Sequence, residues 1–171
     1  MFIFDRIKSK LQREIRKKSR ANTPWQGQTT FAYKKGETWY EPLMAGALTF
    51  VDDCCSAKTI IDLIELLRKL TPDKYMEFIL EYYKTGINRF GNKWKYADIL
   101  TVLYGISKNI TVNSYLEIGV RRGRSMSVVA SIHPNARLVG FDMWLPDYAG
   151  MENPGPEFVQ KELEKAGVFA I

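Results

Sequence analysis

The chain has 171 residues, of which 46% are hydrophobic and 26% are charged, and its formal net charge is +6. This length and composition suit a globular domain with a core large enough to fold alone. Residues 1–20 hold eight basic side chains and two acids, so residues 21–171 are neutral overall and give no reason to expect nucleic-acid binding.

The cysteine and histidine content points to a cytoplasmic protein without a metal centre. Cys54 and Cys55 are adjacent, and neighbouring cysteines rarely reach disulfide geometry, which fits a reducing compartment. We expect both to be buried apolar side chains. One histidine, His133, leaves no zinc-binding set, so we predict no metal. No apolar run approaches the roughly 20 residues that a membrane span needs, and residues 1–4 are too short for a signal-peptide core.

Residues 1–21 form the first predicted segment, a basic amphipathic helix. The helical pattern over residues 2–20 has one narrow apolar stripe, made of Phe4, Ile7, Leu11 and Ile15. Such a helix can make peripheral contact with an anionic membrane surface. Alternatively it packs its stripe on the body and leaves its charges in water, and we favour this second interpretation.

Residues 22–110 form the second predicted segment, an irregular and helical subdomain. Residues 22–55 are rich in aromatic side chains and interrupted by glycine and proline, so we expect irregular structure with a small hairpin over 31–40. The aromatic side chains could form a substrate or lid surface, but packing of a loop onto the core is the interpretation we favour.

Three helices are predicted in the rest of this segment. Ser56 is expected to cap a buried helix, and Thr71 to cap a second one, which Gly86 ends. A third helix is expected over 94–108. The second helix should direct these side chains to the core: Tyr75, Met76, Phe78, Ile79, Tyr82 and Tyr83.

A strand, a glycine loop, a helix and a second strand ending in an acid follow. Gly119 allows a tight turn and close approach by a ligand, and Gly123 lets the next helix start against the strand. We expect Ser125 to cap the helix over 126–132, whose free amides attract negative charge. Asp142 ends the second strand, where a carboxylate can accept hydrogen bonds from both hydroxyl groups of a ribose.

The glycine spacing separates this loop from other nucleotide-binding loops. A nicotinamide or flavin fingerprint needs G-x-G-x-x-G, and a phosphate-binding loop needs a Gly-Lys-Ser/Thr ending; the chain has neither here. Arg121, Arg122 and Arg124 could steer an anionic acceptor, but we favour solvated loop charges. His133 is expected to be a surface residue at a helix end.

Glu117-x-Gly119-x-x-x-Gly123 resembles the first motif of class I S-adenosylmethionine-dependent methyltransferases. The segments around Asp142 and 148–156 resemble a bacterial subgroup grouped with sugar- or macrolide-type O-methyltransferases and cephalosporin-hydroxylase-like proteins. The resemblance implies a Rossmann-like α/β sheet over residues 111–171, the third predicted segment, and S-adenosylmethionine as cofactor. It implies that Glu117 and the Gly119 backbone hold the methionine end of the cofactor and that Gly123 allows the close turn. It also implies that Asp142 binds the ribose hydroxyls and that Met143 or Trp144 lines the adenine.

The resemblance also implies that only part of the sheet is present. After an amphipathic helix over 157–166, a third strand is expected from residue 168. The first strand would then be an open apolar edge, through which a homo-oligomer could form.

Three functions follow from these observations. The first is methylation of oxygen on a small molecule or sugar, by a chain that we expect to be truncated, to lack its acceptor half and to be inactive alone; its catalytic residues stay unassigned. The alternative is a non-catalytic binding or assembly module with a residual half-site for a nucleotide. The third is a peripheral membrane protein that uses residues 2–20.

Overall fold

The structure is a computed structural model that describes residues 47–168. The predictions for the helix over 2–20 and the hairpin over 31–40 lie outside this range, and of the predicted third strand only Val168 is described. The described chain is a mixed α/β structure with two parallel strands. Its elements are α2 (Ala47–Cys55), α3 (Ala57–Leu67), α4 (Lys74–Phe90), η1 (Gly91–Lys93), α5 (Ile99–Asn109), β1 (Ser114–Ile118), α6 (Arg124–Ile132), β2 (Arg137–Phe141), η2 (Tyr148–Gly150) and α7 (Pro156–Lys165).

The helices α3, α4 and α5 build the larger of two apolar clusters. Ser56 caps α3 as predicted, since its side chain accepts a hydrogen bond from the Thr59 amide. Val128 of α6 belongs to the same cluster, so the helices and the α/β unit share one core across the boundary predicted near residue 110. The fully or nearly fully buried members include Ile60, Leu63, Leu67, Met76, Tyr83 and Val128.

The prediction of irregular structure up to residue 55 is wrong for its last nine residues, which form α2. This helix approaches α5 closely at Gly105, where a Cβ would lie only 2.7 Å from the Cys54 backbone. Cys54 is buried, as predicted, whereas Cys55 is half-buried. Tertiary packing of α2 therefore overrides the weak local pattern.

The prediction for α4 is wrong at both ends. Asp73, and not Thr71, is its N-cap, with its side chain accepting from the Met76 amide at 2.7 Å. The helix passes through Gly86 and ends at Gly91, whose φ of +58° suits a glycine. Gly86 is buried inside the helix, and a glycine is needed there since a side chain would collide with the ring of Trp94.

The aromatic side chains of α4 divide between two faces. Met76, Ile79 and Tyr83 are buried as predicted. Tyr75, Phe78 and Tyr82 do not face the core; they are 54%, 63% and 42% exposed. Both faces are apolar at helical spacing, so periodicity alone does not choose between them.

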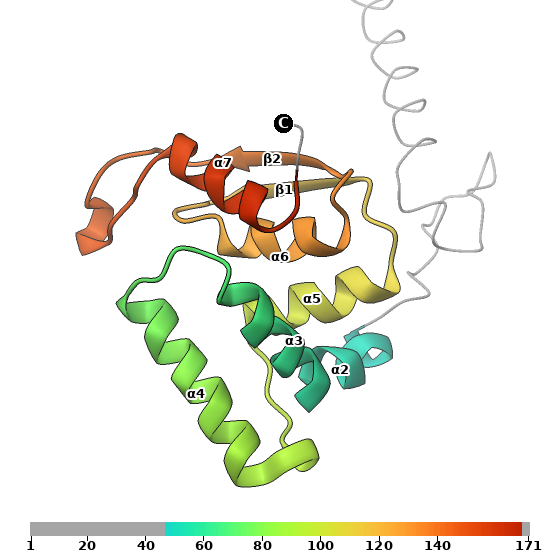
Figure 1. Ribbon diagram of the computed structural model, residues 1–171. Helices are drawn as coiled ribbons and strands as arrows, with labels where there is room; N and C mark the ends of the chain where they lie inside the picture. The colour runs from blue at the N-terminus through green and yellow to red at the C-terminus, as the bar shows by residue number, and fades with distance from the viewer. Residues whose placement is uncertain (1–46, 169–171) are drawn as a thin grey trace, which may run out of the picture. The chain divides into compact units, whose positions relative to one another are not determined.

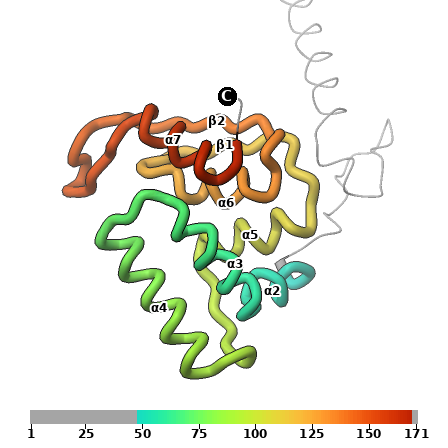
Figure 2. Tube along the Cα trace, viewed as in Figure 1, coloured from blue at the N-terminus to red at the C-terminus, as the bar shows by residue number. Residues whose placement is uncertain are grey.

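An extended segment precedes α5, which begins five residues later than predicted. Figure 2 follows the trace from the end of α4 through this segment back to α5. Asp98 caps α5 in a capping box with Thr101, and its other carboxylate oxygen accepts from the Tyr83 hydroxyl at 2.5 Å. The cap therefore also ties α5 to α4.

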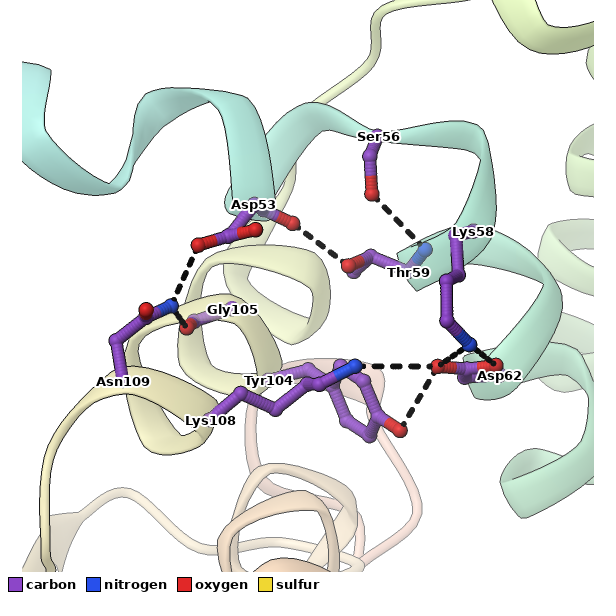
Figure 3. A network of polar contacts seen from close by, with 9 residues as sticks. All are labelled: Asp53, Ser56, Lys58, Thr59, Asp62, Tyr104, Gly105, Lys108 and Asn109. Carbon is purple, nitrogen blue, oxygen red and sulfur yellow. Dashed lines mark hydrogen bonds and ion pairs between the residues drawn. The ribbon is translucent and has the colours of Figure 1, made fainter.

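A polar network joins α2, α3 and α5 on the side shown in Figure 3. Asn109 donates to the Asp53 carboxylate at 2.7 Å, and the Thr59 hydroxyl donates to the Asp53 carbonyl at 2.6 Å. Asp62 accepts from the Tyr104 hydroxyl at 3.2 Å and pairs with Lys58 at 3.1 Å. These contacts are structural, and they lie on helices away from the two strands.

The two strands lie side by side and parallel, connected through α6, as Figure 1 shows. Leu116 pairs in register with Val139, and Ile118 pairs with Phe141. This arrangement confirms the predicted strand, loop, helix and strand. The second apolar cluster covers one face of the sheet and consists of Val120, Met126, Ala130, Val159, Leu163 and Val168, with Tyr115 and Leu138 packed on it.

The other face of the sheet is open in the described chain. Leu116, Ile118 and Phe141 are 58%, 82% and 61% exposed. These are residues of one strand face, because side chains in register on parallel strands point the same way. The described part of the chain therefore presents an apolar surface in addition to the open strand edge that was expected.

Candidate functional site

The loop between β1 and α6 contains two glycines in left-handed conformations with different surroundings. Gly119 has φ +84°, its amide donates to the Phe141 carbonyl at 2.8 Å, and a Cβ there would meet no atom within 4 Å. Gly123 has φ +70°, and a Cβ there would lie 2.7 Å from Cγ1 of Val159. Gly119 thus opens the loop toward space that a ligand can use, whereas Gly123 lets α7 pack against the loop.

The start of α6 differs from the prediction. The helix begins at Arg124, its N-cap is Gly123, and no side chain caps it. Ser125 lies inside the first turn and donates to Glu117 Oε1 at 2.5 Å. The prediction that Ser125 caps α6 is therefore wrong, since its hydroxyl donates to a half-buried carboxylate in β1 and no side chain caps the helix.

Glu117 is held in β1 by hydroxyl groups on both of its oxygens. The Tyr115 hydroxyl donates to Oε2 at 2.8 Å, opposite the bond from Ser125. Burial raises the pKa of Glu117, and the two hydroxyl donors act in the opposite direction. Each oxygen keeps an acceptor position, so the carboxylate can still receive a donor such as an ammonium group.

Asp142 follows β2 directly and closes two loops. Its Oδ2 accepts from the Arg121 amide at 2.9 Å, and its Oδ1 accepts from the Trp144 amide at 3.0 Å and from Asn153 Nδ2 at 2.9 Å. The amides of Arg121 and Trp144 are the main reason that the pKa of Asp142 is lowered. A carboxylate has about four acceptor positions; these three donors fill most of them, and the Val120 amide also lowers the pKa of Asp142.

The two residues expected beside an adenine have different environments. Met143 is 58% exposed. Trp144 has φ +52° and is half-buried against the cluster of Val120 and Leu163. Met143 is thus available to a flat ligand, whereas Trp144 fixes the end of β2 with part of its ring in the core.

Two of the three loop arginines are not solvated, which corrects the prediction. The side chains of Arg122 and Arg124 are only 6% and 11% exposed. Both lie against Asp73, and Arg122 also pairs with Glu152. The sequence carried no signal for this pairing, because Asp73 and Glu152 lie far from the loop along the chain.

His133 lies at the end of α6, as predicted, but it is half-buried and not a fully exposed surface residue, with Nε2 2.8 Å from the Ser107 carbonyl. Asn153, which closes on Asp142, lies in the segment that carried part of the resemblance and had no role assigned to it. Among residues 47–168 no helix is both long and apolar enough to cross a membrane. The same residues contain no cluster of three or more metal-binding side chains.

The site therefore joins the carboxyl ends of β1 and β2 with the start of α6. Glu117, Gly119 and Asp142 meet there, and Asn153 and Met143 border it. Comparisons with protein-family models, with curated proteins and with solved structures found no match to this chain.

Proposed function

We propose that this chain binds S-adenosylmethionine at the carboxyl edge of β1 and β2, in a Rossmann-like unit of the class I methyltransferase type. The observation that carries the proposal is the pair of Gly119 and Asp142. A left-handed glycine with open space around its missing side chain ends one parallel strand, and a carboxylate ends its neighbour. Ligands of open parallel sheets bind beside the carboxyl ends of the strands.

The residues present fit this cofactor. Glu117 keeps acceptor positions for the ammonium group of the methionine end, and the uncapped start of α6 favours its carboxylate. The open space at Gly119 allows the ligand to approach the backbone. Asp142 would accept a ribose hydroxyl beside the amides that already donate to it, and the exposed side chain of Met143 offers an apolar surface for adenine.

When bound, S-adenosylmethionine supplies an activated methyl group, and the protein's part is to hold it and align an acceptor. Glu117 and Asp142 would fix the two ends of the cofactor, and the Gly119 turn would set its depth. The proposed acceptor is an oxygen of a small molecule or sugar. No residue of the described chain is assigned as a base.

A binding module without catalysis is the second candidate, and one observation favours it. Three of the four acceptor positions of Asp142 already serve Arg121, Trp144 and Asn153. A ribose that used both carboxylate oxygens would have to displace Asn153 or the Trp144 amide. In that case the Asp142 carboxylate only holds together the loops that contain Arg121, Trp144 and Asn153.

Isothermal titration calorimetry with S-adenosylhomocysteine, the demethylated product, tests the proposal, with NAD and ATP as comparison ligands. We expect binding of the first ligand alone, and binding weaker by about tenfold or more in Asp142→Asn, which loses one charge-assisted acceptor. Asp147→Asn, which changes an exposed acid of the next loop, is the matched control and should bind as the wild type does. Absence of heat at millimolar S-adenosylhomocysteine would refute cofactor binding.

An assay with methyl-labelled S-adenosylmethionine then separates the two candidates. Transfer of label to a small-molecule or sugar acceptor would establish catalysis. Binding without transfer across a panel of hydroxylated acceptors would favour the module.

A further inference from the structure

An ionic cluster connects the start of α4 to the glycine loop. Asp73 caps α4 and also pairs with two arginines of the loop. Its Oδ1 lies 2.6 Å from Arg124 Nη2, and its Oδ2 lies 3.4 Å from Arg122 Nε. Burial alone would raise the pKa of Asp73, but the close guanidinium of Arg124 and the hydrogen bond from the Met76 amide lower it. One carboxylate therefore does two things: it caps a helix and forms ion pairs with two cations of a distant loop.

Arg122 extends the cluster to a third part of the chain. Its Nη1 pairs with Glu152 Oε2 at 2.8 Å, and its guanidinium lies 4.5 Å from the ring centre of Phe158 in α7. Arg124 lies over the ring of Tyr75, at 5.6 Å from its centre. The two arginines thus contact α4, the segment before α7, and α7 itself.

Burial makes the loop depend on Asp73. Arg122 and Arg124 are nearly buried, whereas Glu152 is 62% exposed and can serve only Arg122. Nε and Nη2 of Arg124 are buried without a well-directed hydrogen bond, although Nη2 is close to Asp73, so this guanidinium relies on the charge of Asp73. Removing one partner of a buried ion pair leaves an uncompensated charge, and outward movement of the loop would expose that charge to water.

The arginines flank the residues that shape the candidate site. Arg122 precedes Gly123, and Arg124 opens α6, whose next residue binds Glu117. Arg121 donates its amide to Asp142. Outward movement of Arg122 and Arg124 would therefore shift the loop backbone that Gly119, Glu117 and Asp142 share.

We propose that Asp73 is a positioning residue for the glycine loop, through which α4 sets the affinity of the site for S-adenosylmethionine. This inference rests on the proposed function for its ligand, but its structural part does not. Asp73 contacts neither Glu117 nor Asp142 and acts through the arginines.

The variant Asp73→Asn removes the charge and keeps a side chain that caps helices as well as aspartate does. Asp98→Asn is the control for a lost helix-capping charge, because Asp98 caps α5 and pairs with no arginine in the described chain, although it also accepts from the Tyr83 hydroxyl. Hydrogen exchange of the amides over residues 119–125 reports on the loop, and exchange in α3 reports on the core. Calorimetry with S-adenosylhomocysteine reports on the site.

We expect Asp73→Asn to speed exchange of the loop amides by about tenfold and to weaken S-adenosylhomocysteine binding by about tenfold, a usual size for coupling between sites. Exchange in α3 should match that of the wild type. Loop exchange unchanged in Asp73→Asn would overturn the proposal, as would a loosened loop with undiminished affinity. If Asp73→Asn does not fold, Glu152→Gln tests the Arg122 side of the same cluster, and we expect smaller effects on loop exchange and on affinity in the same direction; no change in loop exchange would overturn the proposal.

Wild-type calorimetry separates the two proposals. Wild-type chain without heat from S-adenosylhomocysteine would refute the proposed function, and the proposed effect on the site with it. Wild-type binding with a rigid loop in Asp73→Asn would refute only the role of Asp73.

Discussion

The two glycines of the loop should respond very differently to the same substitution. Gly119→Ala places a methyl group in open space, so its cost is the strain of a left-handed alanine, about 1–2 kcal/mol. Gly123→Ala carries the same strain and also sets a methyl group 2.7 Å from Val159 Cγ1. Overpacking adds about 1–3 kcal/mol, so we expect a total of about 2–5 kcal/mol.

Thermal and urea unfolding measure this difference. For a chain of this size, 1 kcal/mol lowers Tm by about 3 °C, so Gly119→Ala should lose about 3–6 °C and Gly123→Ala about 6–15 °C. The double variant Gly123→Ala with Val159→Ala removes the colliding Cγ1. Its two changes should therefore couple favourably by about 1–3 kcal/mol in a double-mutant cycle.

Ligand binding should show the opposite order. Gly119→Ala fills the space through which S-adenosylhomocysteine is proposed to approach the backbone, so binding should fall by at least about tenfold in a folded protein. Equal destabilisation by the two substitutions would refute the argument from packing. Full binding by Gly119→Ala would refute the assignment of that glycine to the ligand.

Three further changes test the rest of the structure. Gly105→Ala sets a methyl group 2.7 Å from the Cys54 backbone, which cannot turn aside, so unfolding in urea should show a loss of about 3 kcal/mol; a loss under 0.5 kcal/mol would contradict the close approach of α2 and α5. Burial raises the pKa of Glu117 from its ordinary 4.5, so the folded chain holds this proton longer than the unfolded chain, and stability should fall as the pH rises from 4.5 through the folded pKa. Glu117→Gln should abolish that part of the pH dependence, and an unchanged stability profile would show that the carboxylate is not buried as described. Ile118 is 82% exposed, so Ile118→Lys should reduce self-association in light scattering with a change in stability within about 0.5 kcal/mol, and a large loss of stability would mean that this face is covered.

Local patterns in the sequence predicted the centre of the fold correctly. The short apolar runs, the glycines after β1 and the acid after β2 specify a strand, a turn, a helix and a strand within about 30 residues. Ser56 was identifiable as a cap because its partner, the Thr59 amide, lies three residues away. Such features depend on neighbours in the chain, so the sequence shows both partners at once.

The errors concern residues whose partners are distant. Gly86 resembles a helix end in the sequence, but it is a buried site that makes room for Trp94. Tyr75 and Tyr83 both lie at helical spacing, and only packing against α3 and α5 decides which of them is buried.

The candidate site shows the same division. Gly119 and Gly123 were identified from their spacing, Asp142 from its place after the second strand and Glu117 from the resemblance, whereas the environment of each was decided by tertiary contacts. Asn153 donates a hydrogen bond to the Asp142 carboxylate. Asp73 pairs with Arg122 and Arg124, which lie 49 and 51 residues later in the chain. A charge run in sequence is usually solvated, and only the fold shows that two of these arginines are buried with an acid between them. The sequence by itself determined which residues meet at the strand ends, and the tertiary structure decided how tightly each is held, because burial and ion pairing depend on segments that local spacing does not connect.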